Sequence, residues 1–596
     1  MLVSGQSEPF SKRVRTSPNA LVPNWFPQQM RCGPMLVERL LLAMGDSDVH
    51  GLVAAGDKPN GPPQERPMMK RIACLLTCVM LGTSPGITGE SDSVAPGDWI
   101  TFNRTLDGSR FSPLSEINRE NVGRLRPLCT YTLPEVVALE TGPLVIDGTM
   151  YFTSDTGSYA IDADTCAEKW RRVREVAKPN GYGAHRGFGY LDGTLFRGTS
   201  DGHVIALDAK DGRTKWDVTL DIAGPGVAMP MAPIAYDHKV FIGNAGGEQV
   251  GVTGHVYGLD AETGRTLWRF DVVPDTNAVR ATWRNPQGKP PSGGGFWTSF
   301  TLDTSRRQLY VPAGNPAPDF DLAMRPGKNL YANSVLAIDV DTGHLVAYNQ
   351  IVQNDFHDWD VDSPPALVTT HNGRRLVASA NKDGLLTVLD RDHQLKIVYQ
   401  QPTTTRLNVT TPLSREHGVR FCPGIAGGTE WNGASYDPGL NTIFIGALDW
   451  CSTVRVQAAD ARVPRQGALW LGGAEMPLEK MFDAAEDGRG RVTAFDADSG
   501  EVRWKFQTPR PINAAVTPTA GGLLFTADLG GRFYAFDARS GHVLWQHELG
   551  QVTGGGIVTY LASGRQRVAI ASGMKSPFWP GAVDASRIVI FGVEAP

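Results

Sequence analysis

Short runs of alternating hydrophobic and polar residues follow one another through most of the chain after residue 90, and turn residues separate them. This alternation predicts half-buried β-strands, because successive side chains of a strand point to opposite faces. Gly (67) and Pro (41) are frequent among the 596 residues, whereas only 20% of the residues are charged. The composition therefore favours many tight turns over long helices.

A unit of the form A-x-D-x-x-T-G-x-x-x-W recurs along this part of the chain. It predicts a hairpin in which a first strand ends at the Asp, the Gly supplies the positive φ of the turn, and a second strand ends at a Trp that packs against a neighbour. The copies are AIDADTCAEKW (160–170), ALDAKDGRTKW (206–216), GLDAETGRTLW (258–268), AFDADSGEVRW (494–504) and AFDARSGHVLW (535–545), and copies without the Trp begin at Ala337 and Val388.

The spacing of the copies predicts a β-propeller. One hairpin cannot bury its apolar faces alone, and repeats of forty to fifty residues with short strands are typical of propeller blades. The gap from Val388 to Ala494 leaves room for an eighth unit, for which the strand-turn-strand pattern of 434–450 is suitable. We therefore predict an all-β fold, an eight-bladed β-propeller with Trp-docking repeats, in which residues 587–593 close the ring with a strand near the start of the propeller. An open solenoid or tandem sandwiches agree less well with the Trp spacing.

The first 89 residues differ from the rest. Residues 1–67 lack sustained periodicity, and we predict that they are disordered or not part of the true protein. The basic stretch 68–71, the ten apolar residues 72–81 and a small-residue exit are typical of a signal peptide, and ten residues are too few to span a bilayer. We predict a signal peptide at 68–89 and a mature propeller at 90–596 that is exported to the periplasm and has no membrane span. A buried core segment is the alternative for 72–81.

The charge of the chain bears on its partners, and its cysteines bear on possible disulfides. With 57 basic and 62 acidic residues the net charge is −5, so no nucleic-acid partner is expected. Four of the seven cysteines follow residue 90, and an oxidising compartment permits two disulfides among them. We favour Cys129 with Cys166 and Cys422 with Cys451, because each pair flanks a candidate hairpin or blade segment. Other pairings, or four buried thiols, stay open.

Several segments between the repeats carry a more specific pattern. They are LETGPLVIDGTMYFTS (139–154), HRGFGYLDG (185–193), GNAGGEQVGVTG (243–254), GGGFWTSFTLD (293–303), AGNPAP (313–318), HDWDVD (357–362) and NKDGLLTVLDR (381–391). With these segments in this order, residues 97–595 resemble the quinoprotein alcohol dehydrogenases, eight-bladed propellers that bind pyrroloquinoline quinone (PQQ) and a metal ion on the central axis. The Trp repeat alone also occurs in non-catalytic propeller scaffolds of bacterial outer-membrane assembly, which are the alternative class.

The resemblance implies a set of cofactor-binding residues. PQQ is a flat tricyclic o-quinone with three carboxylates, so its site needs an aromatic surface and groups that balance negative charge. By resemblance, Trp297 stacks on the cofactor, Arg186 binds a carboxylate, Lys382 lies beside the quinone oxygens and Glu140 hydrogen-bonds the cofactor. Glu430 stands near the cofactor where many members have Asn. Without the resemblance these residues would be interpreted as a core Trp, surface cations and turn residues.

The resemblance also implies the metal ligands and the catalytic base. Glu248, Asn315 and Asp360 are the expected ligands, and all offer the oxygen atoms that Ca²⁺ prefers. Asp360 is in addition the expected general base. One residue is inserted after Glu248 relative to the family pattern, so Gln249 is an alternative at that place.

Asp362 lies two residues after Asp360, where lanthanide-using members have an extra Asp. If the segment is a strand, alternation places both carboxylates on one face, and a lanthanide ion becomes an alternative to Ca²⁺. The other possibility is that Asp362, followed by Ser363, Pro364 and Pro365, turns out of the site and caps a loop.

Some residues depart from the family pattern. Many members have two adjacent Cys that cover the second face of the cofactor, whereas GYGAHRG (181–187) has none, so Tyr182 or His185 are the candidates to cover that face. Ala245 stands where a Ser is common. These differences bear on cofactor affinity and on the choice of substrate.

The chain contains no C-x-x-C-H haem signature, so electrons are expected to leave to an external acceptor, a cytochrome c or a quinone. We therefore predict a periplasmic, PQQ- and metal-dependent dehydrogenase that oxidises an alcohol or a related hydroxyl compound. A non-enzymatic scaffold for protein assembly in the cell envelope is the alternative.

Overall fold

The repeat unit forms the outer half of seven of the eight blades, as the sequence predicts. In a computed structural model that describes residues 94–176, 182–284, 288, 290–474 and 480–593, Trp268 pairs across the sheet with Gly258 of its own repeat. Its indole Nε1 donates to the carbonyl of Val340 in the next blade at 2.9 Å. The ring rests on Gly343, where an added Cβ would lie 2.5 Å from it. The Trp thus joins adjacent blades, and the same bond links Trp170 to Ala209, Trp216 to Ala261 and Trp504 to Ala538.

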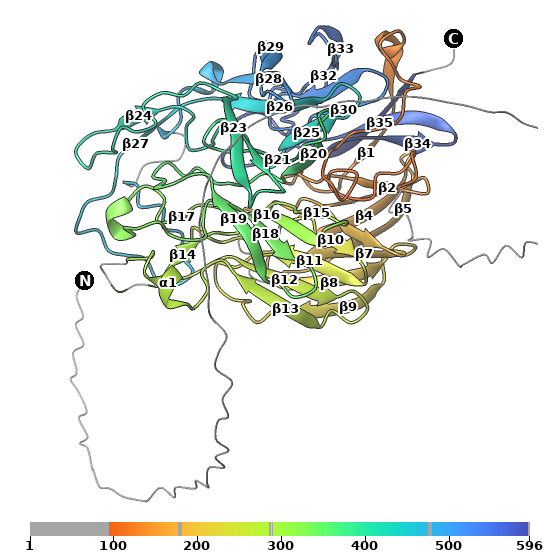
Figure 1. The fold of residues 1–596 in the computed structure, drawn as a ribbon. Coiled ribbons are helices and arrows are strands. Elements are labelled where there is room, and N and C mark those ends of the chain that lie inside the picture. The colour runs from red at the N-terminus through yellow and green to blue at the C-terminus, as the bar shows by residue number, and fades with distance from the viewer. Residues whose placement is uncertain (1–93, 177–181, 285–287, 289, 475–479, 594–596) are drawn as a thin grey trace, which may run out of the picture. The chain divides into compact units, whose positions relative to one another are not determined.

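The described residues form eight four-stranded antiparallel sheets that follow one another in chain order (Figure 1). They are β2–β5 (Leu144–Ile146, Thr149–Thr153, Gly157–Asp162, Glu168–Val173), β6–β9 (Gly189–Leu191, Thr194–Gly198, His203–Asp208, Thr214–Thr219), β10–β13 (Ile234–Tyr236, Lys239–Gly243, His255–Asp260, Thr266–Asp271), β15, β16, β18 and β19 (Thr301–Asp303, Gln308–Pro312, Ser334–Asp339, Leu345–Gln350), β20–β23 (Ala366–Thr369, Arg375–Ala380, Leu385–Asp390, Lys396–Pro402), β25, β26, β28 and β29 (Ala434–Asp437, Thr442–Asp449, Arg489–Asp496, Val502–Thr508), β30–β33 (Thr517–Pro518, Leu523–Ala527, Arg532–Asp537, Val543–Glu548), and β34, β35, β36 and β1 (Ile557–Ala562, Arg565–Ser572, Arg587–Val593, Leu125–Thr132). The predicted eight-bladed propeller is confirmed.

Short elements lie between the blade strands. They are the helix α1 (Asn277–Arg280), the 3-10 turns η1 (Val122–Arg124), η2 (Leu322–Met324) and η4 (Ala485–Asp487), and the two-stranded pairs β14–β17 (Ser292–Gly293, Pro316–Ala317) and β24–β27 (Val419–Phe421, Ser452–Val454). Within the described ranges, no helix has the length and apolar character needed to cross a membrane. The predicted signal peptide and residues 1–67 lie outside the described residues.

The ring closes as predicted. The C-terminal strand β36 pairs with β1, so the last sheet combines the two ends of the propeller. The Cys129–Cys166 disulfide joins β1 to the turn after β4 in the first blade, and a second disulfide joins Cys422 to Cys451. Both favoured cysteine pairings are confirmed, and the first one locks the closing blade to its neighbour.

The predicted position of the eighth unit is wrong. Residues 434–450 form β25 and β26, which belong to the sheet whose β28 and β29 contain the 494–504 copy of the repeat. The eighth blade is the closing one. Residues 455–488 are an insertion within the sixth sheet, between β27 and β28, and repeat spacing alone does not distinguish an insertion inside a blade from an additional blade.

Candidate active site

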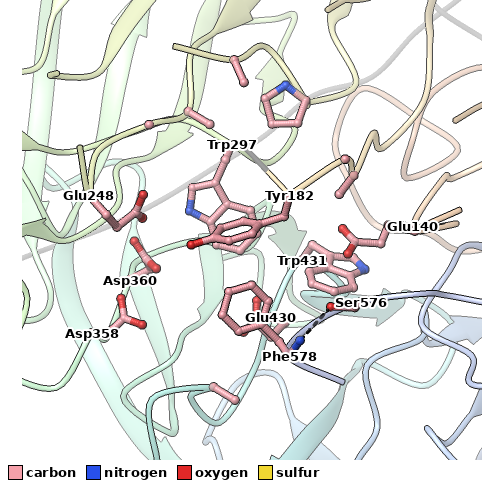
Figure 2. A pocket seen from close by; sticks show the side chains of 18 of the residues that line it. Glu140, Tyr182, Glu248, Trp297, Asp358, Asp360, Glu430, Trp431, Ser576 and Phe578 are labelled. Carbon is pink, nitrogen blue, oxygen red and sulfur yellow. Dashed lines mark hydrogen bonds between the residues drawn. The ribbon is translucent and has the colours of Figure 1, made fainter. Parts of the chain in front are cut away.

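A cavity lies among the loops that connect the blades (Figure 2). Charged and aromatic side chains together line it, as in a small-molecule binding site. Seven of the nine predicted site residues line it: Glu140, Arg186, Glu248, Trp297, Asp360, Lys382 and Glu430.

The antiparallel order of the strands explains why these residues meet. Each lies within six residues of either the start of a blade's first strand or the end of its second strand. In an antiparallel pair these two points are at the same end, so all of the loops emerge on one face of the ring. Glu140 precedes β2 and Glu430 precedes β25, for example, and the two side chains line one cavity although 290 residues separate them.

One part of the cavity is a cationic and aromatic cluster. Arg186 forms a buried ion pair with Glu140, with 2.8 Å between Nη2 and Oε2. Its guanidinium carbon lies 4.6 Å from the ring centre of Trp297 and 4.8 Å from that of Trp431. Burial raises the pKa of Glu140, although Arg186 opposes the shift. A cation between two indole rings is suited to a flat, anionic ligand.

A second part of the cavity is strongly acidic. The Asp360 carboxylate accepts a hydrogen bond from the backbone N–H of Asn315 at 2.8 Å through Oδ1, and its Oδ2 is 3.1 Å from Nζ of Lys382. Lys382 is also 3.3 Å from Asp358. Burial alone would lower the pKa of Lys382, but Asp358 and Asp360 outweigh it and the pKa is raised well above its ordinary value. Lys382 is therefore a fixed positive charge beside Asp360.

Asn315 and Asp362 are buried residues that do not line the cavity. Asn315 is buried and contacts Asp360 through its backbone. Asp362 is 2% exposed, and neither carboxylate oxygen has a hydrogen-bond partner in the described part of the chain. Residues 357–365 are not a strand, so the alternation that predicted a shared face does not apply. Asp362 does not turn out to solvent either, and burial together with the negative charges of Glu430 and Asp360 raises its pKa well above the ordinary value.

Sequence reasoning missed two carboxylates of this cluster, Asp319 and Asp358. Asp319 is buried and accepts a hydrogen bond from the Asn315 side chain at 2.8 Å. Asp358 lines the cavity and contacts Lys382. Asp358 could have been found, because it is the first Asp of the motif HDWDVD. Asp319 follows AGNPAP directly but gives no further signal in the sequence.

The donor chemistry of the acidic cluster suits a hard cation. One carboxylate oxygen of Asp319 and both carboxylate oxygens of Asp362 have no hydrogen-bond partner among the described residues. All three oxygen atoms are buried. Burial and mutual repulsion raise the pKa values of Glu248 and Asp319, which is the expected behaviour of carboxylates that lack a compensating cation. Within the described ranges no group of three His, Cys, Asp or Glu side chains is arranged so that it could hold a metal ion. The expected ligand set differs from such a group, because it combines the carboxylates of Glu248 and Asp360 with the Asn315 amide.

Comparison with known proteins identifies the family of the chain. Residues 99–405 match the family described as "Glucose/ethanol/alcohol dehydrogenase, beta-propeller domain", and residues 488–573 match "Outer membrane protein assembly factor BamB". The chain is 30% identical over 548 residues to quinohemoprotein alcohol dehydrogenase ADH IIB of Pseudomonas putida. The aligned region covers 84% of this chain and 78% of that protein.

Two further relatives extend the comparison. Methanol dehydrogenase [cytochrome c] subunit 1 of Methylobacterium organophilum is 26% identical, over 82% of this chain and 86% of its own length. The crystal structure of quinohemoprotein alcohol dehydrogenase from Comamonas testosteroni superposes with a TM-score of 0.75 at 26% identity, over 85% of this chain and 82% of that one. The chain belongs to the PQQ-dependent (quinoprotein) alcohol dehydrogenases, a family of propeller oxidoreductases.

Proposed function

We propose that the cavity binds PQQ with one metal ion and that Asp360 is the general base in the oxidation of an alcohol. The observation that carries this proposal is the Asp360 carboxylate, which lines the cavity, is buried and is paired with Lys382 at 3.1 Å. A carboxylate that lines a cavity beside a cation is placed to accept the proton of a substrate hydroxyl.

The other residues have supporting roles in this proposal. Trp297 offers a flat surface to the ring system, Arg186 balances a carboxylate, and Lys382 lies beside the quinone oxygens. Glu140 orients Arg186 through the ion pair, and Glu430, whose pKa burial raises to about 8, can donate a hydrogen bond as a neutral acid. Glu248, Asn315 and Asp360 would hold the metal ion, with Asp362 close behind them. When bound, PQQ with its metal ion supplies the electrophilic carbon that accepts the hydride of the alcohol.

Asp360 and its neighbours perform the proton transfer. The backbone N–H of Asn315 fixes Oδ1 of Asp360, so the carboxylate presents a constant orientation to the cavity. The proton of the substrate hydroxyl moves to this carboxylate as the hydride leaves the carbinol carbon. Aromatic and aliphatic side chains on the cavity wall exclude water, and they include Phe320, Ile425, Leu471, Phe482, Trp431 and Trp579.

We also propose a periplasmic location and a cytochrome c as the electron acceptor. The chain has no C-x-x-C-H haem motif, whereas its relative from Pseudomonas putida is named a quinohemoprotein. Another relative is named for cytochrome c as its acceptor. The candidate signal peptide at 68–89 supports export, and a membrane quinone is the second possible acceptor.

Reconstitution tests the proposal. Purified apo-protein is incubated with PQQ and Ca²⁺, and dye-linked oxidation is followed with a panel of primary and secondary alcohols. We expect activity that requires both additions. A protein that binds no PQQ under any metal would instead support the scaffold alternative, for which the match of residues 488–573 to an assembly factor is the only specific argument.

A further inference from the structure

The loop that precedes β6 lacks the cysteine pair with which many family members cover the second face of PQQ. The segment GYGAHRG (181–187) contains Tyr182 and His185 instead. Both line the cavity, as does Trp297, which offers the first face. The positions of these two side chains show which of them is free to contact a ligand.

His185 is an anchor of the loop. It is 1% exposed, its Nδ1 is 2.9 Å from the Thr153 hydroxyl, and its Nε2 is 3.0 Å from the carbonyl of Gly198. Both ring nitrogens are therefore engaged with neighbouring blade strands. A ring fixed in this way cannot move over a bound cofactor, but it fixes the place of the loop that carries Tyr182.

Tyr182 has the opposite environment. The residue is 50% exposed, and it lines the cavity as Trp297 does (Figure 2). Phe578, from the loop between β35 and β36, contacts it edge-to-face with 4.6 Å between ring centres. Phe578 is itself held by the hydrogen bond from its backbone N–H to the Ser576 hydroxyl at 3.1 Å. A half-exposed Tyr with a single aromatic neighbour retains ring surface that a ligand can contact.

The Tyr182 phenol also lies near the acidic part of the cavity. Burial within the cavity, together with the negative charges of Glu248 and Asp358, raises the pKa of its hydroxyl. Figure 2 shows the phenol oxygen of Tyr182 pointing toward Glu248 and Asp360, which are predicted metal ligands. A flat ligand that stacks on Trp297 beside those ligands would have Tyr182 as its neighbour on the open side.

We propose that Tyr182, braced by Phe578, covers the face of the cofactor opposite Trp297 and so replaces the cysteine pair of other family members. This inference rests on the proposed binding of PQQ. Two aromatic rings on opposite faces hold a flat ring system by stacking, and the edge contact with Phe578 reduces the freedom that Tyr182 loses on binding.

Equilibrium binding of PQQ tests the proposal without any activity measurement. Quenching of Trp fluorescence is titrated with PQQ in the presence of Ca²⁺ for the full chain and for Tyr182→Ala, Tyr182→Phe and Phe578→Ala. We expect the PQQ dissociation constant to rise about tenfold in Tyr182→Ala, about threefold in Phe578→Ala, and less than twofold in Tyr182→Phe, which retains the ring.

Tyr348→Ala is the matched control. Tyr348 is 39% exposed and makes the same kind of edge contact, with Tyr331 at 4.6 Å, but it lies on the outer strand β19. It should leave the dissociation constant unchanged, and thermal unfolding of each apo-protein shows whether the variant is folded.

The titrations distinguish a failure of PQQ binding from a failure of the Tyr182 contact. If the unaltered chain binds no PQQ, the proposed function is wrong. If it binds PQQ and folded Tyr182→Ala binds equally well, Tyr182 does not cover the cofactor. If Tyr182→Phe loses as much affinity as Tyr182→Ala, the hydroxyl and not the ring makes the contact, which also overturns the proposal.

Discussion

The side-chain amide of Asn315 donates from Nδ2 to Oδ1 of Asp319 at 2.8 Å, and both residues are buried. A carboxylate accepts hydrogen bonds, so this contact turns the NH₂ group of Asn315 toward Asp319 and leaves the amide oxygen free to face elsewhere. The backbone N–H of the same Asn315 donates to Asp360. Asp319 is thus the residue that orients a predicted metal ligand without being one of the predicted ligands.

Removal of Asp319 should therefore weaken metal binding. We expect Asp319→Ala to lower the Ca²⁺ affinity of the PQQ-loaded protein by about 10- to 100-fold, the usual effect of losing a residue that orients a ligand. Titration of metal-free protein with Ca²⁺, followed by the absorbance of bound PQQ, measures the change. Asp341→Ala, at an exposed aspartate, is the control. An unchanged affinity in Asp319→Ala would show that Asn315 needs no orientation or is not a ligand.

Asp360→Asn should retain PQQ but lose nearly all turnover. An amide cannot accept the hydroxyl proton at neutral pH, and general base catalysis is worth at least about 100-fold. Steady-state dye reduction and PQQ titration of the same preparation give both quantities. Asp358→Asn is the comparison, because Asp358 also contacts Lys382 but has no predicted role as base. Turnover of Asp360→Asn within about threefold of the unaltered enzyme would remove Asp360 from that role.

Asp362 tests the identity of the metal ion. A trivalent ion gains more than Ca²⁺ from an additional anionic oxygen, and both oxygens of Asp362 lack a partner in the described part of the chain. We expect La³⁺ to support activity at lower concentration than Ca²⁺, and Asp362→Ala to abolish this preference. Parallel titrations of the PQQ-loaded apo-protein with the two ions decide the question. Activity with Ca²⁺ alone, unchanged by Asp362→Ala, would contradict the lanthanide interpretation.

The Cys129–Cys166 disulfide should stabilise the closed ring. The two cysteines are 37 residues apart, and they connect the closing blade to the first blade. Loss of the bridge gives the unfolded chain more conformational freedom and removes the covalent link between β1 and the first blade. We expect Cys129→Ser with Cys166→Ser to lower the apparent free energy of unfolding in urea by about 2–4 kcal/mol. Cys422→Ser with Cys451→Ser is the comparison, because that bridge lies beside the β24–β27 pair and does not connect the two ends of the propeller. Four free thiols in the oxidised protein would contradict both bridges.

The sequence by itself determined the repeat, the blade number and the pairing of the chain ends. These are local or periodic properties: each hairpin shows its own turn chemistry, and the Trp of four of the five complete copies docks on a Gly of the next repeat. The resemblance in motifs such as HDWDVD and GGGFW was also sufficient to select seven residues that line one cavity.

Only the tertiary structure decided which loops meet and how their side chains are held. It placed 434–450 inside the sixth blade, added Asp319 and Asp358 to the acidic cluster, and showed that His185 is an anchor whereas Tyr182 is free. The physical reason is that the site exists only after the ring has closed. Its residues come from loops of different blades, separated by up to 290 positions, and their mutual distances depend on the packing of all the blades between them.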